Sequence, residues 1–250
     1  MIAGVVLQGA LAPAVLAATP SERAVSFPSL NAAGVVLEGM VAVPPAGAAV
    51  AGVVICHPNP LAGGTMDNEI VKDLRAAFSR AGVATLRFNF RGVGRSTGSF
   101  GAGTDEVSDV LGALEFLRQH GGVDPAHVSV VGYSFGARVG LEGAVRDGKV
   151  VAVACLGFPA RDQDDVSRSA YFKGINFPTM FVAGTEDTVC RFGVLEDIVR
   201  TYGVGTLCRL EPIQGADHYL REVGQRGIAV KRIVRFVTGI AAHPLASSPP

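Results

Sequence analysis

The chain has 250 residues and a mass of 25.8 kDa, which is enough to bury the core of one large α/β domain without disulfides or metals. Its 48% hydrophobic content excludes a disordered chain, and 22 basic residues balance 22 acidic ones, so no charged surface favours nucleic acid. No run after the first 18 residues approaches a membrane span, and we expect a globular protein with neither a membrane nor a nucleic-acid partner.

An N-terminal extension over residues 1–21 precedes the main domain, which we expect over 22–243. Met1–Ala18 is apolar and ends in small residues, as a secretory signal does. It lacks a positively charged start, and Gln8 and Pro13 interrupt it. We therefore expect a cytoplasmic protein; a secreted or periplasmic one is the alternative if this segment acts as a signal.

From residue 22 onward, short apolar runs alternate with longer helical patterns, which is typical of a mostly parallel sheet with helices on both faces. The first two strands, 24–27 and 35–43, have no helix between them and should be antiparallel. The other predicted strands are 50–56, 83–90, 128–131, 150–158, 179–183 and 207–211; the predicted helices are 68–81, 104–120, 135–146, 192–202 and 223–240. The Pro- and Ser-rich tail over 244–250 is expected to fray.

The four cysteines, at positions 56, 155, 190 and 208, form no CxxC pair and are expected to be small buried hydrophobes. His57 follows Cys56, but no second Cys/His pair stands at ligand spacing. We expect no metal and no cofactor.

The sharpest motif is GYSFG over 132–136, a GxSxG between a predicted strand and a predicted helix. A serine in that turn is pushed out of the sheet, and the flanking glycines leave room for close backbone approach. The following helix directs its N-terminal N–H groups at developing negative charge. Ser134 is therefore the candidate nucleophile.

A second GxSxG contains Ser96, and the glycines around it also imitate a dinucleotide-binding fingerprint. This segment leads into further turn residues rather than a helix, so it lacks the context of either motif. A tight glycine turn, with Arg91 and Arg95 fixing the loop, is the favoured interpretation.

A serine needs a base and a carboxylate that orients the base. His218 follows the last strand, at the correct end of the sheet, whereas His120, His127 and His243 are badly placed. Asp187 likewise follows the C-terminal end of its strand, 179–183, where open α/β sheets place their ligands. The rivals for the acid are Glu186, Asp217, Asp164 and Asp165.

In this order, the motifs resemble those of the α/β-hydrolase superfamily, and within it a group of small bacterial hydrolases related to dienelactone hydrolase-like esterases. The resemblance spans about 22–237 and rests on CHPNPLAGGTMDN, LRFNFRGVGRSTGSF, GYSFG, GTED and GADH. It implies an α/β-hydrolase fold with an eight-stranded, mostly parallel sheet whose second strand is antiparallel. It also implies a Ser134–Asp187–His218 triad.

The resemblance further implies an oxyanion hole made by the N–H of Phe135 and a second N–H from the loop after the third strand. Because proline has no N–H, that donor should be Asn59, with Leu61 as the alternative. His57 would brace the loop. Dienelactone hydrolases use a cysteine nucleophile, so the serine here departs from their pattern.

Together these features predict a serine hydrolase that cleaves carboxylic esters or thioesters through an acyl-enzyme, with a small-molecule ester as its partner. A peptidase or lactonase using the same triad is the alternative, as is a catalytically silent ligand-binding fold. Only about twenty residues, 159–178, separate two predicted strands, too few for a crossover helix and a lid. We therefore expect little or no cap domain and a preference for short acyl chains.

Overall fold

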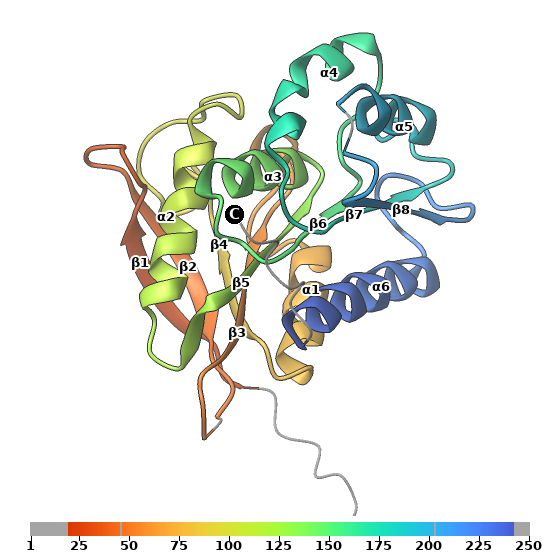
Figure 1. Ribbon diagram of the computed structural model, residues 1–250. Coiled ribbons are helices and arrows are strands. Elements are labelled where there is room, and N and C mark those ends of the chain that lie inside the picture. Colours follow the sequence, from red (N-terminus) through yellow and green to blue (C-terminus); the bar gives the residue numbers. More distant parts are fainter. Residues whose placement is uncertain (1–19, 46, 203, 243–250) are drawn as a thin grey trace, which may run out of the picture.

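The computed structural model describes residues 20–45, 47–202 and 204–242, and in this part of the chain eight strands form one sheet (Figure 1). Residues 1–19, most of the predicted N-terminal extension, and the predicted tail lie outside it. The strands are β1 (Arg23–Pro28), β2 (Val36–Ala42), β3 (Val50–Cys56), β4 (Ala84–Phe88), β5 (Val123–Tyr133), β6 (Val153–Leu156), β7 (Thr179–Gly184) and β8 (Cys208–Ile213). The helices are α1 (Glu69–Arg80), α2 (Glu106–Gln119), α3 (Phe135–Asp147), α4 (Gln163–Arg168), α5 (Phe192–Thr201) and α6 (Val223–Ala242), with short 3-10 turns η1 (Pro60–Ala62) and η2 (Ala170–Gly174).

The strand order is β1-β2-β4-β3-β5-β6-β7-β8. β2 pairs antiparallel with both β1 and β4, and the pairs from β4 to β8 are parallel. The predicted mostly parallel sheet with an antiparallel second strand is confirmed. Because parallel strands end at the same edge, the loops after β3, β5, β7 and β8 gather at one end of the sheet.

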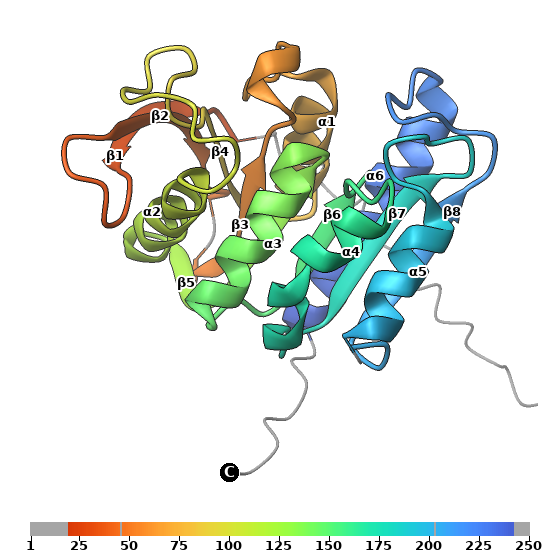
Figure 2. The same cartoon turned by 90° about the horizontal axis from the view of Figure 1, so that it is seen from above.

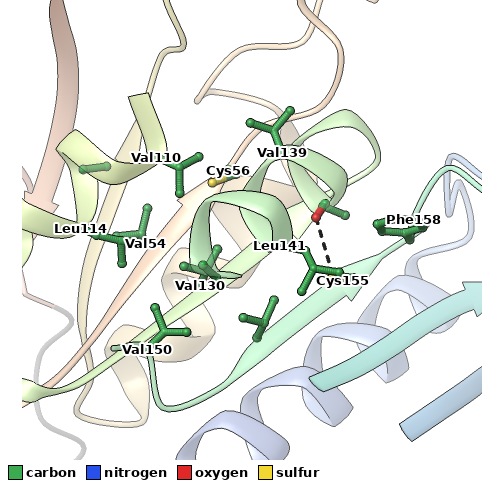
Figure 3. Packing of buried hydrophobic residues seen from close by; sticks show 14 of the residues in the cluster. Val54, Cys56, Val110, Leu114, Val130, Val139, Leu141, Val150, Cys155 and Phe158 are labelled. Carbon is green, nitrogen blue, oxygen red and sulfur yellow. Dashed lines mark hydrogen bonds between the residues drawn. The ribbon is translucent and has the colours of Figure 1, made fainter. Parts of the chain in front are cut away.

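Helices cover both faces of the sheet (Figure 2): α2, α3, α4 and α5 lie on one face and α1 and α6 on the other. Each face has its own cluster of buried residues. On the first face, α3 packs on β5 and β6 through Val130, Val139, Leu141 and Phe158, and the Cys155 thiol donates to the Ala137 carbonyl (Figure 3). The central strands are apolar on both faces because both faces are covered.

Seven of the eight strands differ at an end from the prediction, most of them by one or two residues, and three of them show why. β5 begins at Val123 rather than 128, because Val123 pairs with Val50 before the register shifts. β4 ends at Phe88, and beyond it the N–H of Phe90 donates to the His57 ring, 3.1 Å away, instead of to a strand. β6 begins at Val153 rather than 150.

The segment between β6 and β7 contains only α4 and η2. No cap domain is present there, as predicted. None of the helices in the described ranges has the length and apolarity needed to cross a bilayer.

Candidate active site

Ser134 stands in the turn that joins β5 to α3. Its backbone angles, φ 54° and ψ −119°, are strained for a residue that carries a side chain. A strained turn of this kind exposes the nucleophile in a GxSxG motif. A Cβ on Gly132 would lie 2.2 Å from the Gly136 carbonyl oxygen, and one on Gly136 would lie 2.4 Å from the carbonyl oxygens of Cys56 and His57. Both glycines are thus required by close backbone packing, as the motif predicted.

The structure brings the three predicted side chains together. Ser134 Oγ lies 2.9 Å from His218 Nε2, and His218 Nδ1 lies 2.8 Å from Asp187 Oδ2. All three residues are at least 91% buried. With Nδ1–H donating to the carboxylate, Nε2 is left as the acceptor for the serine proton.

Asp187 is fixed by the loop after β7. Its Oδ1 accepts the N–H groups of Val189 and Cys190 at 2.8 and 2.7 Å, and this leaves Oδ2 for His218. The rival carboxylates are engaged elsewhere or exposed. Asp217 pairs with Arg221, Asp164 and Asp165 pair with Arg168, and Glu186 is exposed.

The backbone around His218 is also held in place. Its carbonyl accepts the Tyr133 hydroxyl at 2.9 Å, so the residue before the nucleophile anchors the histidine loop. Gly157, at φ +56°, passes beneath the ring, where a Cβ would lie 3.1 Å from His218 Cε1. Burial raises the pKa of the Tyr133 hydroxyl, which therefore stays protonated as a donor. Neither Tyr133 nor Gly157 was singled out in this role by its sequence pattern.

The other histidines do not compete with His218. His127 pairs with Asp124, and His120 contacts Arg23. His57 is fully buried: its Nδ1 lies 2.6 Å from the Pro58 carbonyl and its Nε2 accepts from Phe90. These bonds match the predicted bracing role. His243 lies outside the described residues.

Near Ser134, the main-chain N–H groups of Asn59 and Phe135 face no acceptor within the described chain. Phe135 is the first residue of α3, whose first N–H groups have no partner inside the helix. The N–H of Leu61, the alternative donor, instead donates to Asn59 Oδ1 at 2.9 Å. Asn59 and Phe135 are therefore the better candidates for an oxyanion hole.

The second GxSxG has a structural role. Ser96 Oγ donates to the Asn89 carbonyl at 2.7 Å and accepts the Glu38 N–H at 3.0 Å. The arginines beside it hold the loop, since Arg91 binds Asp109 through its guanidinium and Arg95 binds Glu38. This geometry agrees with the glycine-turn interpretation.

A pocket of about 650 Å³ opens above Ser134 and His218. The loop after β3, the start of α3, and the segment containing α4 and η2 form its walls. No cap covers it within the described ranges. The pocket can admit a small acyl group to the serine and bind a developing oxyanion at the start of α3.

Comparison with known proteins gives one family. The sequence profile of a family described as "Alpha/beta hydrolase domain" matches residues 50–243.

Solved structures agree with this match. A protein of unknown function from Agrobacterium tumefaciens, suggested to be an alpha/beta hydrolase, is 27% identical, with a TM-score of 0.75 over 92% of this chain and all of that one. A Xanthomonas campestris serine hydrolase without a lid is 23% identical, with a TM-score of 0.68 over 91% and 97% of the two chains. A dienelactone hydrolase from Anabaena variabilis is 21% identical, with a TM-score of 0.71 over 88% and 98%. At these two lower identities the likeness concerns the fold.

Proposed function

This chain belongs to the alpha/beta hydrolase family, and we propose that it is a carboxylesterase-type serine hydrolase that cleaves esters or thioesters of short acyl chains through an acyl-enzyme. The fold class, an eight-stranded α/β-hydrolase sheet with little or no cap, is confirmed. The observation that carries the proposal is the run of hydrogen bonds from Asp187 through His218 to Ser134.

In the first half of the proposed reaction, Ser134 Oγ attacks the ester carbonyl carbon while its proton moves to His218 Nε2. Asp187 stabilises the imidazolium that forms, and the N–H groups of Asn59 and Phe135 bind the oxyanion. The carbonyl re-forms as the bond to the leaving atom breaks, an oxygen in an ester or a sulfur in a thioester, and His218 gives that atom its proton. The product is an alcohol or thiol and an acyl-enzyme.

In the second half, water repeats these steps in the place of the alcohol. His218 takes a proton from the water, the new oxygen bonds to the acyl carbon, and the tetrahedral intermediate collapses. Ser134 leaves with the proton that His218 held. The open pocket admits water without movement of a lid.

The thiols support a cytoplasmic location, which we also propose. All four cysteines are free, and three are buried. Free thiols of this kind suit a reducing compartment. Burial raises the pKa of Cys56, so this thiol stays protonated beside the site and does not compete with the serine as nucleophile.

The proposal is tested with 4-nitrophenyl butyrate and a fluorophosphonate probe. The wild type should hydrolyse the ester and take up one probe on Ser134. Ser134→Ala should lose both, with turnover falling by about 10⁴-fold or more. Ser96→Ala is the control and should keep both per folded molecule.

Labelling of Ser96 would overturn the assignment of the nucleophile. Absence of both labelling and hydrolysis would instead indicate a silent ligand-binding fold. Hydrolysis of aminoacyl amides or lactones in preference to open-chain esters would move the activity to a peptidase or lactonase.

A further inference from the structure

The charged side chains that line the pocket are mostly cationic. Among the described lining residues they are Arg138, Arg161, Arg168 and Asp165, besides His218. The proposed ester cleavage uses none of these arginines. A neutral ester would gain nothing from such a lining, so the excess of positive charge needs its own explanation.

Arg138 lies closest in the chain to the nucleophile. It is one helical turn beyond Ser134, and its N–H donates to the Ser134 carbonyl at 3.3 Å. Its guanidinium rests against the loop that precedes α2: Nη2 lies 3.3 Å from the Ala102 carbonyl, and a Cβ on Gly103 would lie 1.7 Å from Nη2. A side chain at 103 would therefore displace the guanidinium from this position.

The loop is itself held in an unusual shape. Ala102 has a φ of 54° and Gly103 a φ of 88°, and a non-glycine residue in that region is strained. The fully buried carboxylate of Glu106 fixes it, accepting the N–H groups of Gly101 and Gly103 at 2.6 and 2.7 Å. The loop 101–103, strained and held in place by Glu106, thus contacts the guanidinium of Arg138 on one side.

Arg138 has only distant partners of opposite charge. Glu142, one turn further along α3, lies 4.0 Å away and is already bound by Arg146 at 2.6 Å. The Ala102 contact occupies one N–H of a group that carries five. Donors therefore remain available toward the pocket.

We propose that Arg138 binds a carboxylate at the far end of the acyl chain, so that the preferred substrates are half-esters or half-thioesters of short dicarboxylic acids. A planar guanidinium matches the two oxygens of a carboxylate. Arg161 and Arg168, both exposed, add attraction at the mouth of the pocket. This inference rests on the proposed function.

The sheet order places the anionic group on the acyl side. The leaving oxygen must lie near His218, which follows β8 at one edge of the sheet. Arg138 instead rests on the loop 101–103, which follows β4, on the other side of β5. An acyl chain bound at Ser134 would therefore extend away from His218 toward Arg138.

The test compares two esters of equal chain length, 4-nitrophenyl glutarate and 4-nitrophenyl pentanoate, whose acyl chains differ in the terminal carboxylate. For the wild type, kcat/KM should favour the glutarate by at least about tenfold, the effect of one charge-assisted contact. Arg138→Gln should abolish this ratio. Arg200→Ala removes an exposed arginine outside the pocket and should leave the ratio unchanged.

Equal rates for the two esters in the wild type, or a ratio that survives Arg138→Gln, would overturn this inference while the proposed hydrolase stands. If neither ester is cleaved, the hydrolase proposal itself fails. In that case calorimetry with Ser134→Ala still decides the inference: monoethyl glutarate should bind and ethyl pentanoate should not. Equal binding of the two would overturn it.

Discussion

The Asn59 main chain offers a test of the proposed oxyanion hole at the scale of one atom. Its φ of −54° is compatible with proline, so Asn59→Pro removes the N–H with little change in backbone shape. We expect kcat to fall by about 10²–10³-fold, as when one oxyanion donor is lost. Steady-state kinetics with 4-nitrophenyl butyrate measures this.

Asn59→Ala is the matched control, because it removes only the side chain that accepts the Leu61 N–H. It should lose far less activity than Asn59→Pro. Similar losses in both variants would mean that the loop shape, and not the Asn59 N–H, matters.

His57 makes stability depend on pH. Burial lowers its pKa from 6.5 to about 4, so the unfolded chain takes up a proton at a higher pH than the folded one. The free energy of unfolding should therefore be greatest above pH 6.5 and should fall by up to about 3 kcal/mol as the pH drops toward 4. Urea unfolding at a series of pH values measures this.

His57→Gln lowers stability at every pH but cannot titrate, and its curve should be flatter between pH 6.5 and 4. The carboxyl of Glu38, whose pKa is lowered by its hydrogen bonds to Arg95 and Asn89 against the effect of burial, adds a further loss below about pH 4.5 in both proteins. A wild-type curve that is level between pH 6.5 and 4.5 would contradict the assignment of a buried neutral histidine.

At the scale of single residues, the sequence motifs predicted the three side chains that meet at the site. Ser134, Asp187 and His218 follow strand ends, and strand ends of a parallel sheet converge. Arg138 could not be found this way, because nothing in the sequence places residues 101–103 beside α3. Its position depends on loop geometry rather than on periodicity.

The contact between β3 and α3 depends on Gly136, which gives a prediction at the scale of elements. A Cβ there would lie 2.4 Å from two carbonyl oxygens at the end of β3, so Gly136→Ala must push α3 away from the sheet. We expect a loss of about 3 kcal/mol or more in unfolding free energy, and loss of activity in what still folds. Urea unfolding and ester turnover measure the two effects.

Gly239, within α6, serves as the control, because a Cβ added there would meet no other atom within 4 Å in the described chain. Gly239→Ala should be neutral or stabilising by up to about 1 kcal/mol, because alanine favours helices. Equal stability of the two variants would show that the close approach at Gly136 is not needed.

Element positions were predictable where hydrophobic runs are long, and they were less so at the ends of strands. The stretch 123–127 contains Asp124 and Pro125, which are typical of turns, yet Val123 pairs with Val50 across a register shift. Likewise Phe90 continues an apolar run, but its N–H donates to His57. In both cases a tertiary contact, and not the local sequence pattern, determined where the strand begins or ends.

At the scale of the whole molecule, the uncapped pocket predicts how activity depends on acyl length. Without a lid, each added methylene of a long chain stays partly exposed and contributes less than the roughly 0.8 kcal/mol of full burial. For simple alkanoyl 4-nitrophenyl esters, kcat/KM should therefore level off or fall beyond about hexanoyl. A steady rise through dodecanoyl and palmitoyl esters would show that a long-chain site exists.

The central claim is that Ser134 forms an acyl-enzyme, and rapid quenching of the wild type with 4-nitrophenyl butyrate tests it most directly. Acid quench during the first turnovers, followed by digestion and mass spectrometry, locates any butyryl group on the chain. We predict one butyryl group, on the peptide that contains Ser134 and absent in Ser134→Ala. A butyryl group on Ser96 or on a cysteine, or hydrolysis in full without any adduct in the wild type under conditions where the acyl-enzyme accumulates, would contradict the account.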